Sequence, residues 1–196
     1  MTNREQVNKI MDENINQIQI LLEQKSQIWL DHVLFTEYWW LGVALSIFPW
    51  IIWFIYRKKE SSDRLLYAGF FVIAISLMLE VTGAQLGFWH YRYSVIPILP
   101  SFFPWDVALM PVTIMFFLQI KPKTSPTLKA ILFALLTSYV AEPFFTWLGI
   151  YEPKSWRYSY SVPLQMFIYF TAHFLSKRSF FDPIHSIGRK NSAPIK

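Results

Sequence analysis

Long uninterrupted blocks of apolar residues constrain this sequence more than any other feature. Four blocks come close to the ~20 residues that a helix needs to cross the hydrocarbon core of a bilayer, namely residues 38–56, 65–87, 103–120 and 128–151. A fifth block, residues 160–176, is shorter. Charged residues make up only 16% of the chain, against about 25% in a typical soluble domain. We therefore expect an all-α integral membrane bundle of about five transmembrane helices.

The first 35 residues have a different pattern. Apolar residues recur every three or four positions, with one lysine among them: Met11, Ile15, Ile18, Leu22, Lys25 and Trp29. This spacing predicts an amphipathic helix that lies on the membrane or packs on the bundle. Two alternatives are a seam that pairs two copies into a homo-oligomer and a helix that binds another partner. We expect no signal peptide here, because these residues lack its basic start, short apolar stretch and cleavage site.

The positions of the lysines and arginines predict the orientation. Most basic residues flank one set of helix ends, including residues 57–59, Arg64, residues 121–129 and residues 177–178. Because cytoplasmic loops carry an excess of Lys and Arg, we expect the N-terminus outside and the C-terminus in the cytoplasm. The transmembrane bundle then covers residues 36–178, and residues 179–196 form a basic tail.

Two parts of the chain resemble each other. Glu80 and residues 86–89 match Glu142 and residues 148–151 at identical spacing. A stretch rich in Trp and Tyr follows in both copies, after five extra residues in the second. Both copies read helix, outer loop, helix in the same direction, which predicts a parallel repeat of two helical hairpins. The alternative is a chance similarity between two aromatic loops.

Three carboxylates within or beside the apolar blocks are the candidate catalytic residues: Glu80, Glu142 and Asp106. Glu80 and Glu142 each lie seven residues before a glycine, or about 10 Å along a helix at 1.5 Å per residue. A carboxylate in mid-membrane costs about 2.5–3.5 kcal/mol on insertion scales, so both should face the protein interior. They would act there as a ligand or proton site, or else hold helices together. Asp106 follows Pro104 in a first helical turn, which favours helix capping.

Two prolines are expected to bend helices near these carboxylates. Pro111 cannot donate a backbone hydrogen bond, so it should free the carbonyl of Val107. Pro143 directly follows Glu142 and should bend the fourth helix in the same way. Broken helices at membrane depth are tolerated where they line a cavity or are repaired by neighbours.

Aromatic side chains gather in the loops on the expected outer side. A belt at the headgroup level explains part of this enrichment, but the opposite helix ends carry few aromatics. The asymmetry predicts an aromatic-lined outer pocket, with an arginine available for an anionic headgroup. The candidate ligand-binding residues are Trp89, His90, Tyr91, Arg92, Trp105, Trp147, Tyr151, Trp156, Arg157 and Tyr158.

Several kinds of site are not expected. The chain has no cysteine, which excludes disulfides and thiolate chemistry. Its four histidines lack metal-ligand spacing, so we expect no metal. No Walker loop or Gly-rich dinucleotide turn occurs, so we expect no cofactor. The net charge of +5 comes from clusters at the ends of apolar blocks, so nucleic acid is not an expected partner.

The order of residues resembles that of a known family. The segment from Gly87 to Pro111, with its Trp-His-Tyr and Pro-Trp-Asp motifs, carries the resemblance together with Glu142-Pro143 and residues 147–151. It is similar to a family of small multi-pass membrane proteins of spore-forming Gram-positive bacteria, over about residues 36–176. The resemblance implies a bacterial plasma-membrane location. It supplies no activity, because that family has no established one.

A partial resemblance links the chain to the membrane-embedded lycopene cyclases. Their repeats carry a loop rich in Trp or Tyr, followed by a Pro-x-Glu-Glu motif that opens a helix. Residues 104–107 keep one of those carboxylates and residues 163–166 keep none, which argues against proton-driven cyclisation.

These patterns predict a non-enzymatic, multi-pass membrane protein that contacts membrane lipids. Its outer face would bind a small amphiphilic ligand or a membrane partner. The first alternative is an intramembrane enzyme that acts on a lipid or isoprenoid through a carboxylate general acid or base. The second is a structural or assembly subunit that uses the N-terminal helix.

Overall fold

The computed structural model describes residues 3–179, and the predicted tail beyond Ser179 lies outside them. The chain begins with α1 (Asn3–His32), α2 (Glu37–Tyr56), the 3₁₀ turn η1 (Lys59–Ser61) and α3 (Ser62–Gln85). It continues with β1 (Trp89–Tyr91), the π-helical turn η2 (Trp105–Leu109), α4 (Met110–Gln119), α5 (Pro126–Leu136), the π-helical turn η3 (Thr137–Ala141), α6 (Glu142–Trp147), β2 (Tyr151–Pro153) and α7 (Tyr158–Ser176).

The mostly helical fold confirms the all-α prediction, although a small two-stranded sheet is also present. Among the described residues, fewer helical stretches than the predicted five have membrane-spanning length. Three helical stretches are long and apolar enough to cross a membrane: α2, the run from η1 through α3, and the run from α5 through α6. The fourth block was expected to stay helical to residue 151, but its helix ends at Trp147. Tyr151 instead begins β2, because Gly149 turns the chain with φ +72°.

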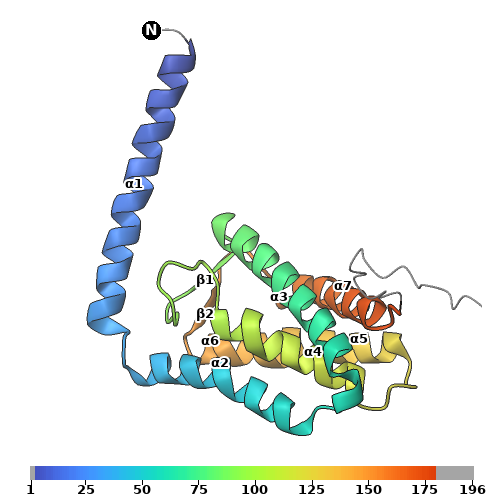
Figure 1. Cartoon of the computed structure of the whole chain (residues 1–196). Coiled ribbons are helices and arrows are strands. Elements are labelled where there is room, and N and C mark those ends of the chain that lie inside the picture. Colours follow the sequence, from blue (N-terminus) through green and yellow to red (C-terminus); the bar gives the residue numbers. More distant parts are fainter. Residues whose placement is uncertain (1–2, 180–196) are drawn as a thin grey trace, which may run out of the picture.

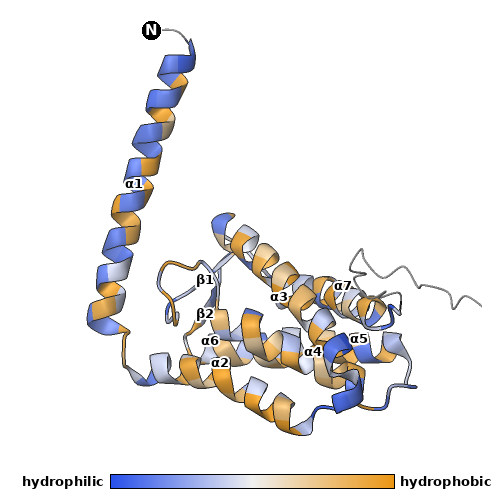
Figure 2. Cartoon of the chain, viewed as in Figure 1, coloured by the Kyte–Doolittle hydropathy of each residue, from blue (hydrophilic) through white to orange (hydrophobic). Residues whose placement is uncertain are grey.

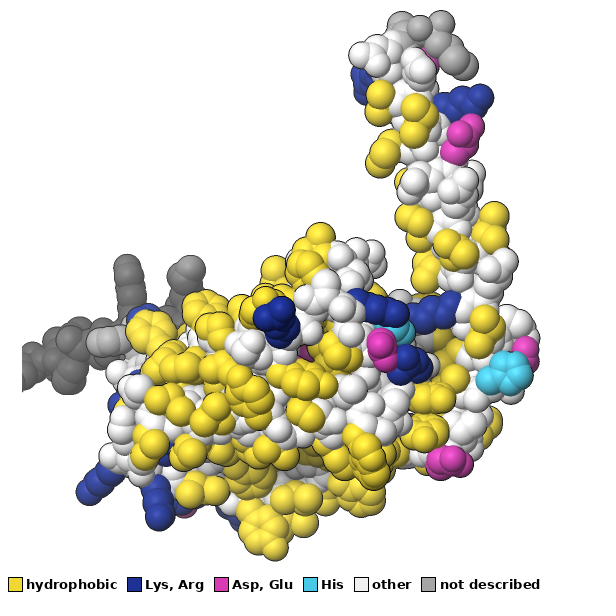
Figure 3. Space-filling view, turned by 180° about the vertical axis from the view of Figure 1, so that it is seen from behind, with side chains coloured by type: hydrophobic (Ala, Val, Ile, Leu, Met, Phe, Trp, Pro, Cys, Tyr) yellow, Lys and Arg dark blue, Asp and Glu magenta, His cyan; other side chains and the backbone are white. Residues whose placement is uncertain are grey.

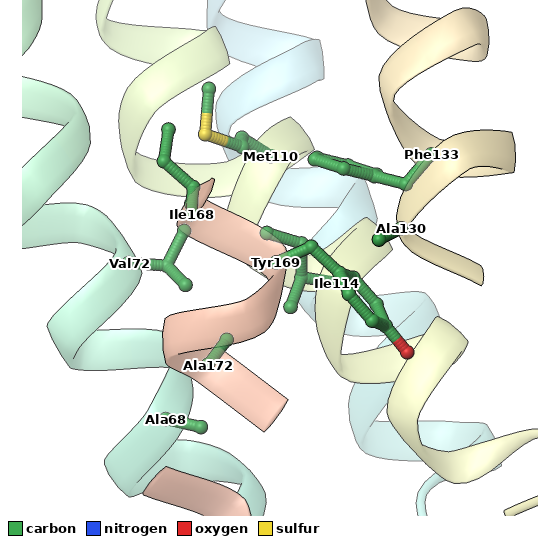
Figure 4. Close-up of a cluster of buried hydrophobic side chains, with 9 residues drawn as sticks. All are labelled: Ala68, Val72, Met110, Ile114, Ala130, Phe133, Ile168, Tyr169 and Ala172. Carbon is green, nitrogen blue, oxygen red and sulfur yellow. The ribbon is translucent and has the colours of Figure 1, made fainter. Parts of the chain in front are cut away.

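Helices α3, α4, α5 and α7 pack around a shared core, and α2 lies along η2 and α4 (Figure 1). Nine side chains form the centre of this core (Figure 4): Ala68, Val72, Met110, Ile114, Ala130, Phe133, Ile168, Tyr169 and Ala172. The outside of the bundle is also apolar (Figure 2). Met78 is 72% exposed and Ile55 is 67% exposed, for example. Exposed apolar surface on this scale fits contact with lipid or another protein.

The two matching segments have the same local backbone. Gly87 and Gly149 both adopt left-handed φ angles, of +71° and +72°, which glycine alone reaches without strain. Each glycine ends a helix, and each is followed two residues later by a strand. The strands β1 and β2 pair in antiparallel register, with His90 opposite Glu152 at the centre. Both central residues lie three positions after their glycine, so the pair has local twofold symmetry.

Backbone hydrogen bonds at the edges of this small sheet obey the same symmetry. The N–H of Arg92 donates to the carbonyl of Ile150 at 3.0 Å, and the N–H of Lys154 donates to that of Phe88 at 2.9 Å. Donors and acceptors again occupy equivalent positions relative to the two glycines. The predicted repeat therefore has a structural counterpart at these two corners.

Both predicted helix bends coincide with π-helical turns. The turn η2 lies just before Pro111, and η3 lies just before Pro143. A π turn adds one residue per hydrogen-bonded ring, which accommodates the missing proline donor. The indole Nε1 of Trp50, on α2, donates to the carbonyl of Val107 at 2.9 Å. A neighbouring helix thus satisfies the carbonyl that Pro111 was expected to free.

Helix α1 leaves the bundle at a steep angle and extends well beyond it (Figure 1). None of its residues is buried. Near its end, the indole Nε1 of Trp29 donates to the carbonyl of Ser94 at 2.7 Å. Figure 3 shows many of its apolar side chains along the edge that faces the bundle, while basic side chains occur on both edges near its tip.

Candidate functional site

A cavity of about 80 Å³ lies inside the bundle next to the β1–β2 sheet. Its wall draws on α3, the sheet, η2, α4, α6 and α7, so both hairpins contribute. Aromatic rings form much of the wall: Trp89, Tyr91, Phe102, Trp105, Phe145, Tyr151 and Trp156. The polar side chains of the wall are Ser76, Glu80, Glu142, Ser161 and Gln165. The two depth-matched glutamates therefore share one cavity.

Glu80 lies on α3 and is only 8% exposed. The indole Nε1 of Trp89 donates a hydrogen bond to its Oε1. The hydroxyl of Tyr91 is a second hydrogen-bonding partner. Burial and the nearby Glu80 carboxylate raise the pKa of Tyr91 well above its usual value, so this hydroxyl stays a donor. Two aromatic donors on β1 thus hold the Glu80 carboxylate in place.

Glu142 begins α6, directly after the π turn η3. Its carboxylate hydrogen-bonds the Ser161 hydroxyl, which accepts from the indole Nε1 of Trp156 at 2.9 Å. In the symmetry of the sheet Trp89 corresponds to Tyr151, whereas Trp156 lies in the aromatic loop after the five extra residues. Each glutamate still connects to a loop tryptophan, directly for Glu80 and through Ser161 for Glu142. The second oxygen of Glu142, Oε2, is buried and has no hydrogen-bond partner among the described residues. Within residues 3–179, it is one of two unpartnered oxygens on lining residues of this cavity, the other being Oε1 of Gln165.

Asp106 does not cap a helix, contrary to the sequence prediction. It lies in the π turn η2 and makes no capping hydrogen bond. Its side chain is fully buried, and its Oδ1 accepts from the hydroxyl of Ser76 on α3. Its other oxygen, Oδ2, has no partner in the described part of the chain. In the π turn this residue is buried within the bundle, and its side chain bonds Ser76 of α3 instead of the free amides of a helix end.

Within the part of the chain that the structure describes, no lysine, arginine or histidine belongs to the cavity wall. Among residues 3–179, no three acidic or histidine side chains converge as a metal-binding group. The carboxyl groups of Glu80 and Glu142 therefore lie among aromatic rings, and no cationic side chain joins them in the wall. Such groups can accept a cation, donate hydrogen bonds when protonated, or transfer a proton to a bound molecule.

The structure divides the predicted ligand-binding residues into two halves. Five line the cavity: Trp89, Tyr91, Trp105, Tyr151 and Trp156. Five do not: His90, Arg92, Trp147, Arg157 and Tyr158. Trp147 is 78% exposed, and Arg157 is exposed as well. Tyr158 donates to the hydroxyl of Thr146 at 3.0 Å and packs beside the aromatic cluster.

Arg92 and His90 lie on the outside of the sheet. Arg92 pairs with Glu152 at 2.5 Å across the two strands, so its charge is already compensated. Partial burial, together with the charges of Lys154 and Arg92, lowers the pKa of His90, which keeps its ring neutral. Neither residue offers a cationic group to the cavity.

The polar side chains that lie near the carboxylates were not among the site residues predicted from the sequence. Ser76 lies four residues before Glu80, and Ser138 lies four residues before Glu142, one helical turn away in each case. Gln165 is the repeat counterpart of Asp106, since both follow a proline by two positions. The oxygens Ser138 Oγ and Gln165 Oε1 are buried without partners among residues 3–179. This repeated spacing was the available signal.

No family model matches the chain, and no curated protein or solved structure matches it either.

Proposed function

We propose that the protein is a multi-pass membrane protein whose β1–β2 end faces outward. Three apolar helices of spanning length, an apolar bundle surface and the concentration of Lys and Arg at the opposite end support this placement. With α4 and α7 packed among these helices, the bundle has five crossings. By the resemblance of its residue order, we place it in a bacterial plasma membrane.

We further propose that the cavity binds the polar end of a small amphiphile. The observation that carries this proposal is that Glu80 and Glu142 line one cavity walled by aromatic rings. Because no described residue of the wall is cationic and Arg92 is paired with Glu152, an anionic headgroup is disfavoured. A hydroxyl or amine group fits better, since carboxyl oxygens accept its hydrogens and aromatic faces attract an ammonium.

Lipid analysis of the purified protein tests this function. The chain is purified in mild detergent, and co-purifying lipids are identified by mass spectrometry. One bound species enriched over bulk membrane lipid is expected, with loss of about tenfold or more in Glu80→Gln and Glu142→Gln, as each removes a hydrogen bond to a charged group. Glu152→Gln, on the outer face of the sheet, is the matched control. Equal lipid content in all four proteins would show that the glutamates only hold helices together.

An intramembrane enzyme is the second candidate. The unpartnered Oε2 of Glu142 favours it, because a general acid or base needs a free oxygen within reach of the reacting group. The lipid identified above would be incubated with the protein in vesicles and followed by mass. A new product that forms with the natural chain, but not with Glu142→Gln, supports catalysis. Unchanged lipid mass leaves binding as the function. If no lipid binds, the assembly role becomes the working hypothesis.

A further inference from the structure

A second cavity opens at the other end of the bundle. It has a volume of about 230 Å³, enough for several water molecules at about 30 Å³ each. The η1 turn, the start of α3, the end of α4, the following loop, α5 and the end of α7 surround it. Its basic lining residues are Lys58, Arg64, Lys129, His173 and Lys177. We call it the basic cavity.

The positive charge of the basic cavity has no acidic partner in the cavity wall. Among residues 3–179, no Asp or Glu belongs to its lining. The ion pairs of Lys9 with Glu13 and of Arg92 with Glu152 both lie far from this end. Figure 3 shows several Lys and Arg side chains at the end of the bundle away from α1. Cations that line a concave site of this kind create a strong positive potential in it.

Lys129 is built into the wall rather than lying on the surface. Only 8% of the residue is exposed. Its Nζ donates to the carbonyls of Phe117 and Ile120, both at 2.6 Å, where α4 ends. An ammonium has three hydrogens, so one donor remains for a molecule in the cavity. The two carbonyl bonds fix the direction of that donor.

Tyr169 supplies an independent observation. Its side chain is fully buried, its ring belongs to the hydrophobic core, and its hydroxyl has no hydrogen-bond partner among the described residues. Figure 4 shows this oxygen pointing away from the rest of the cluster. Tyr169 also lines the basic cavity. A buried hydroxyl is normally hydrogen-bonded, so an orphan donor in a cationic cavity indicates a missing acceptor.

We propose that the basic cavity binds a phosphate group. A phosphate offers several oxygen acceptors and negative charge, which match one oriented ammonium, further cations and a phenol donor. Basic pockets between transmembrane helices on the cytoplasmic side are suited to anionic lipid headgroups. The shared chemistry also fits a free phosphate, so both sources must be tested.

The two cavities are chemically opposite and separate. Met110 and Ile168 line the first cavity, which holds Glu80 and Glu142 and which we call the carboxylate cavity. Tyr169 lines the basic cavity, and all three residues belong to the core cluster between the two cavities. The basic cavity thus stands independently of the proposed outer site. A molecule bound there would contact the starts of α3 and α5 and the ends of α4 and α7.

Native mass spectrometry of the full chain tests the proposal. The protein in mild detergent is mixed with equal amounts of phosphatidylglycerol and phosphatidylcholine, and separately with inorganic phosphate. The site variant is Arg64→Gln with Lys177→Gln. The matched control is Lys121→Gln with Lys123→Gln, which removes the same charge from the nearby exposed loop. Tyr169→Phe removes only the hydroxyl and keeps the core packing.

We expect one phosphatidylglycerol bound in preference to phosphatidylcholine. The site variant should bind it about thirty-fold more weakly, since each basic residue near an anionic lipid contributes roughly a factor of five. The loop control should retain it, and Tyr169→Phe should bind several-fold more weakly. If inorganic phosphate binds with the same variant pattern and displaces the lipid, the ligand is a soluble phosphate. Failure of both probes, or equal losses in the site and loop variants, would overturn the proposal.

Discussion

Gly83 illustrates how one missing side chain positions a carboxylate. A Cβ at this position would lie 2.1 Å from Cη2 of Trp89, so the indole rests directly on the α3 backbone. The same indole donates to Glu80 one turn earlier on α3. The glycine, the tryptophan and the glutamate therefore form one unit, in which the close backbone approach brings the donor to the acid.

We predict that Gly83→Ala displaces the Trp89 indole and breaks its hydrogen bond to Glu80. Forced repacking of this kind costs typically 1–3 kcal/mol, so the melting temperature in detergent should fall by several degrees. The amount of lipid that co-purifies in the carboxylate cavity should fall as well. Gly69→Ala is the control, because its new Cβ meets only the unbranched side chain of Met115, with Sδ at 2.9 Å, and no indole ring. Equal melting temperatures for the two variants would contradict the tight contact.

Single residues also show what the sequence could and could not predict. The inward direction of Glu80 and Glu142 followed from the free-energy cost of exposing a carboxylate to lipid. The hydrogen-bond partner of Asp106 could not be predicted from the sequence. Ser76 is 30 residues away, and only the packing of α3 on η2 brings it near. Local spacing favoured capping, and a contact distant in sequence replaced it.

At the scale of elements, the π turns connect proline chemistry to helix packing. The sequence located both bends, because a proline always removes a donor. It did not identify Trp50 as the group that repairs the first bend, as this depends on how α2 lies against η2. Nor did it predict β1 and β2, which are only three residues long and pair across about 60 positions.

A double-mutant cycle tests the repair of the first bend. Trp50→Phe leaves the carbonyl of Val107 without its donor, and we expect a loss of about 1–3 kcal/mol in unfolding free energy. In a Pro111→Ala background the backbone N–H of residue 111 can take over, so the same change should cost clearly less. Stability is followed by thermal denaturation in detergent. Additive effects of the two changes would show that Trp50 does not serve this carbonyl.

The small sheet has a pH dependence of its own. The hydrogen bond from Arg92, and then its charge, lower the pKa of Glu152 below its usual 4.5. Stabilisation by a carboxylate with a lowered pKa is complete above that usual value. The stabilisation from the Arg92–Glu152 pair is lost as the pH falls below that value and through the lowered pKa of Glu152 in the folded protein. The melting temperature of the natural chain should thus drop more steeply below pH 4.5 than that of Glu152→Gln. Parallel curves would mean that the pair adds nothing to stability.

At the scale of the whole molecule, two cavities of opposite charge and the core between them follow one another along the bundle axis. A carboxylate cavity lies at the sheet end, a hydrophobic core follows, and a cationic cavity lies at the far end. The repeated glutamates in the sequence predicted the cavity at the sheet end. The basic cavity was not predicted, because it forms only where several segments converge. The sequence showed its residues merely as basic loops. Helix α1 stands across this axis (Figure 1), so in a membrane-spanning bundle it would run along the bilayer surface.

We therefore predict that α1 lies in the outer headgroup layer with its apolar stripe toward the lipid. Many apolar side chains of α1 lie on the edge that faces the bundle (Figure 3). Trp29 connects the end of α1 to the loop by its hydrogen bond to the carbonyl of Ser94. An amphipathic helix in this orientation buries its apolar face at the boundary with the acyl chains. The natural chain has no cysteine, so single-cysteine spin labels report each face cleanly.

The labels Ile18→Cys and Asn16→Cys separate three arrangements of α1 in vesicles. On a surface-bound helix, the label at residue 18 collides mainly with lipid-soluble oxygen, and the label at residue 16 mainly with a water-soluble nickel complex. Equal exposure of both labels to the nickel complex would place α1 in water. Protection of residue 18 that disappears on dilution among excess lipid would mark a seam between two copies. Since α1 holds none of the residues of either cavity, its deletion should leave both sites intact while weakening attachment of the outer loop.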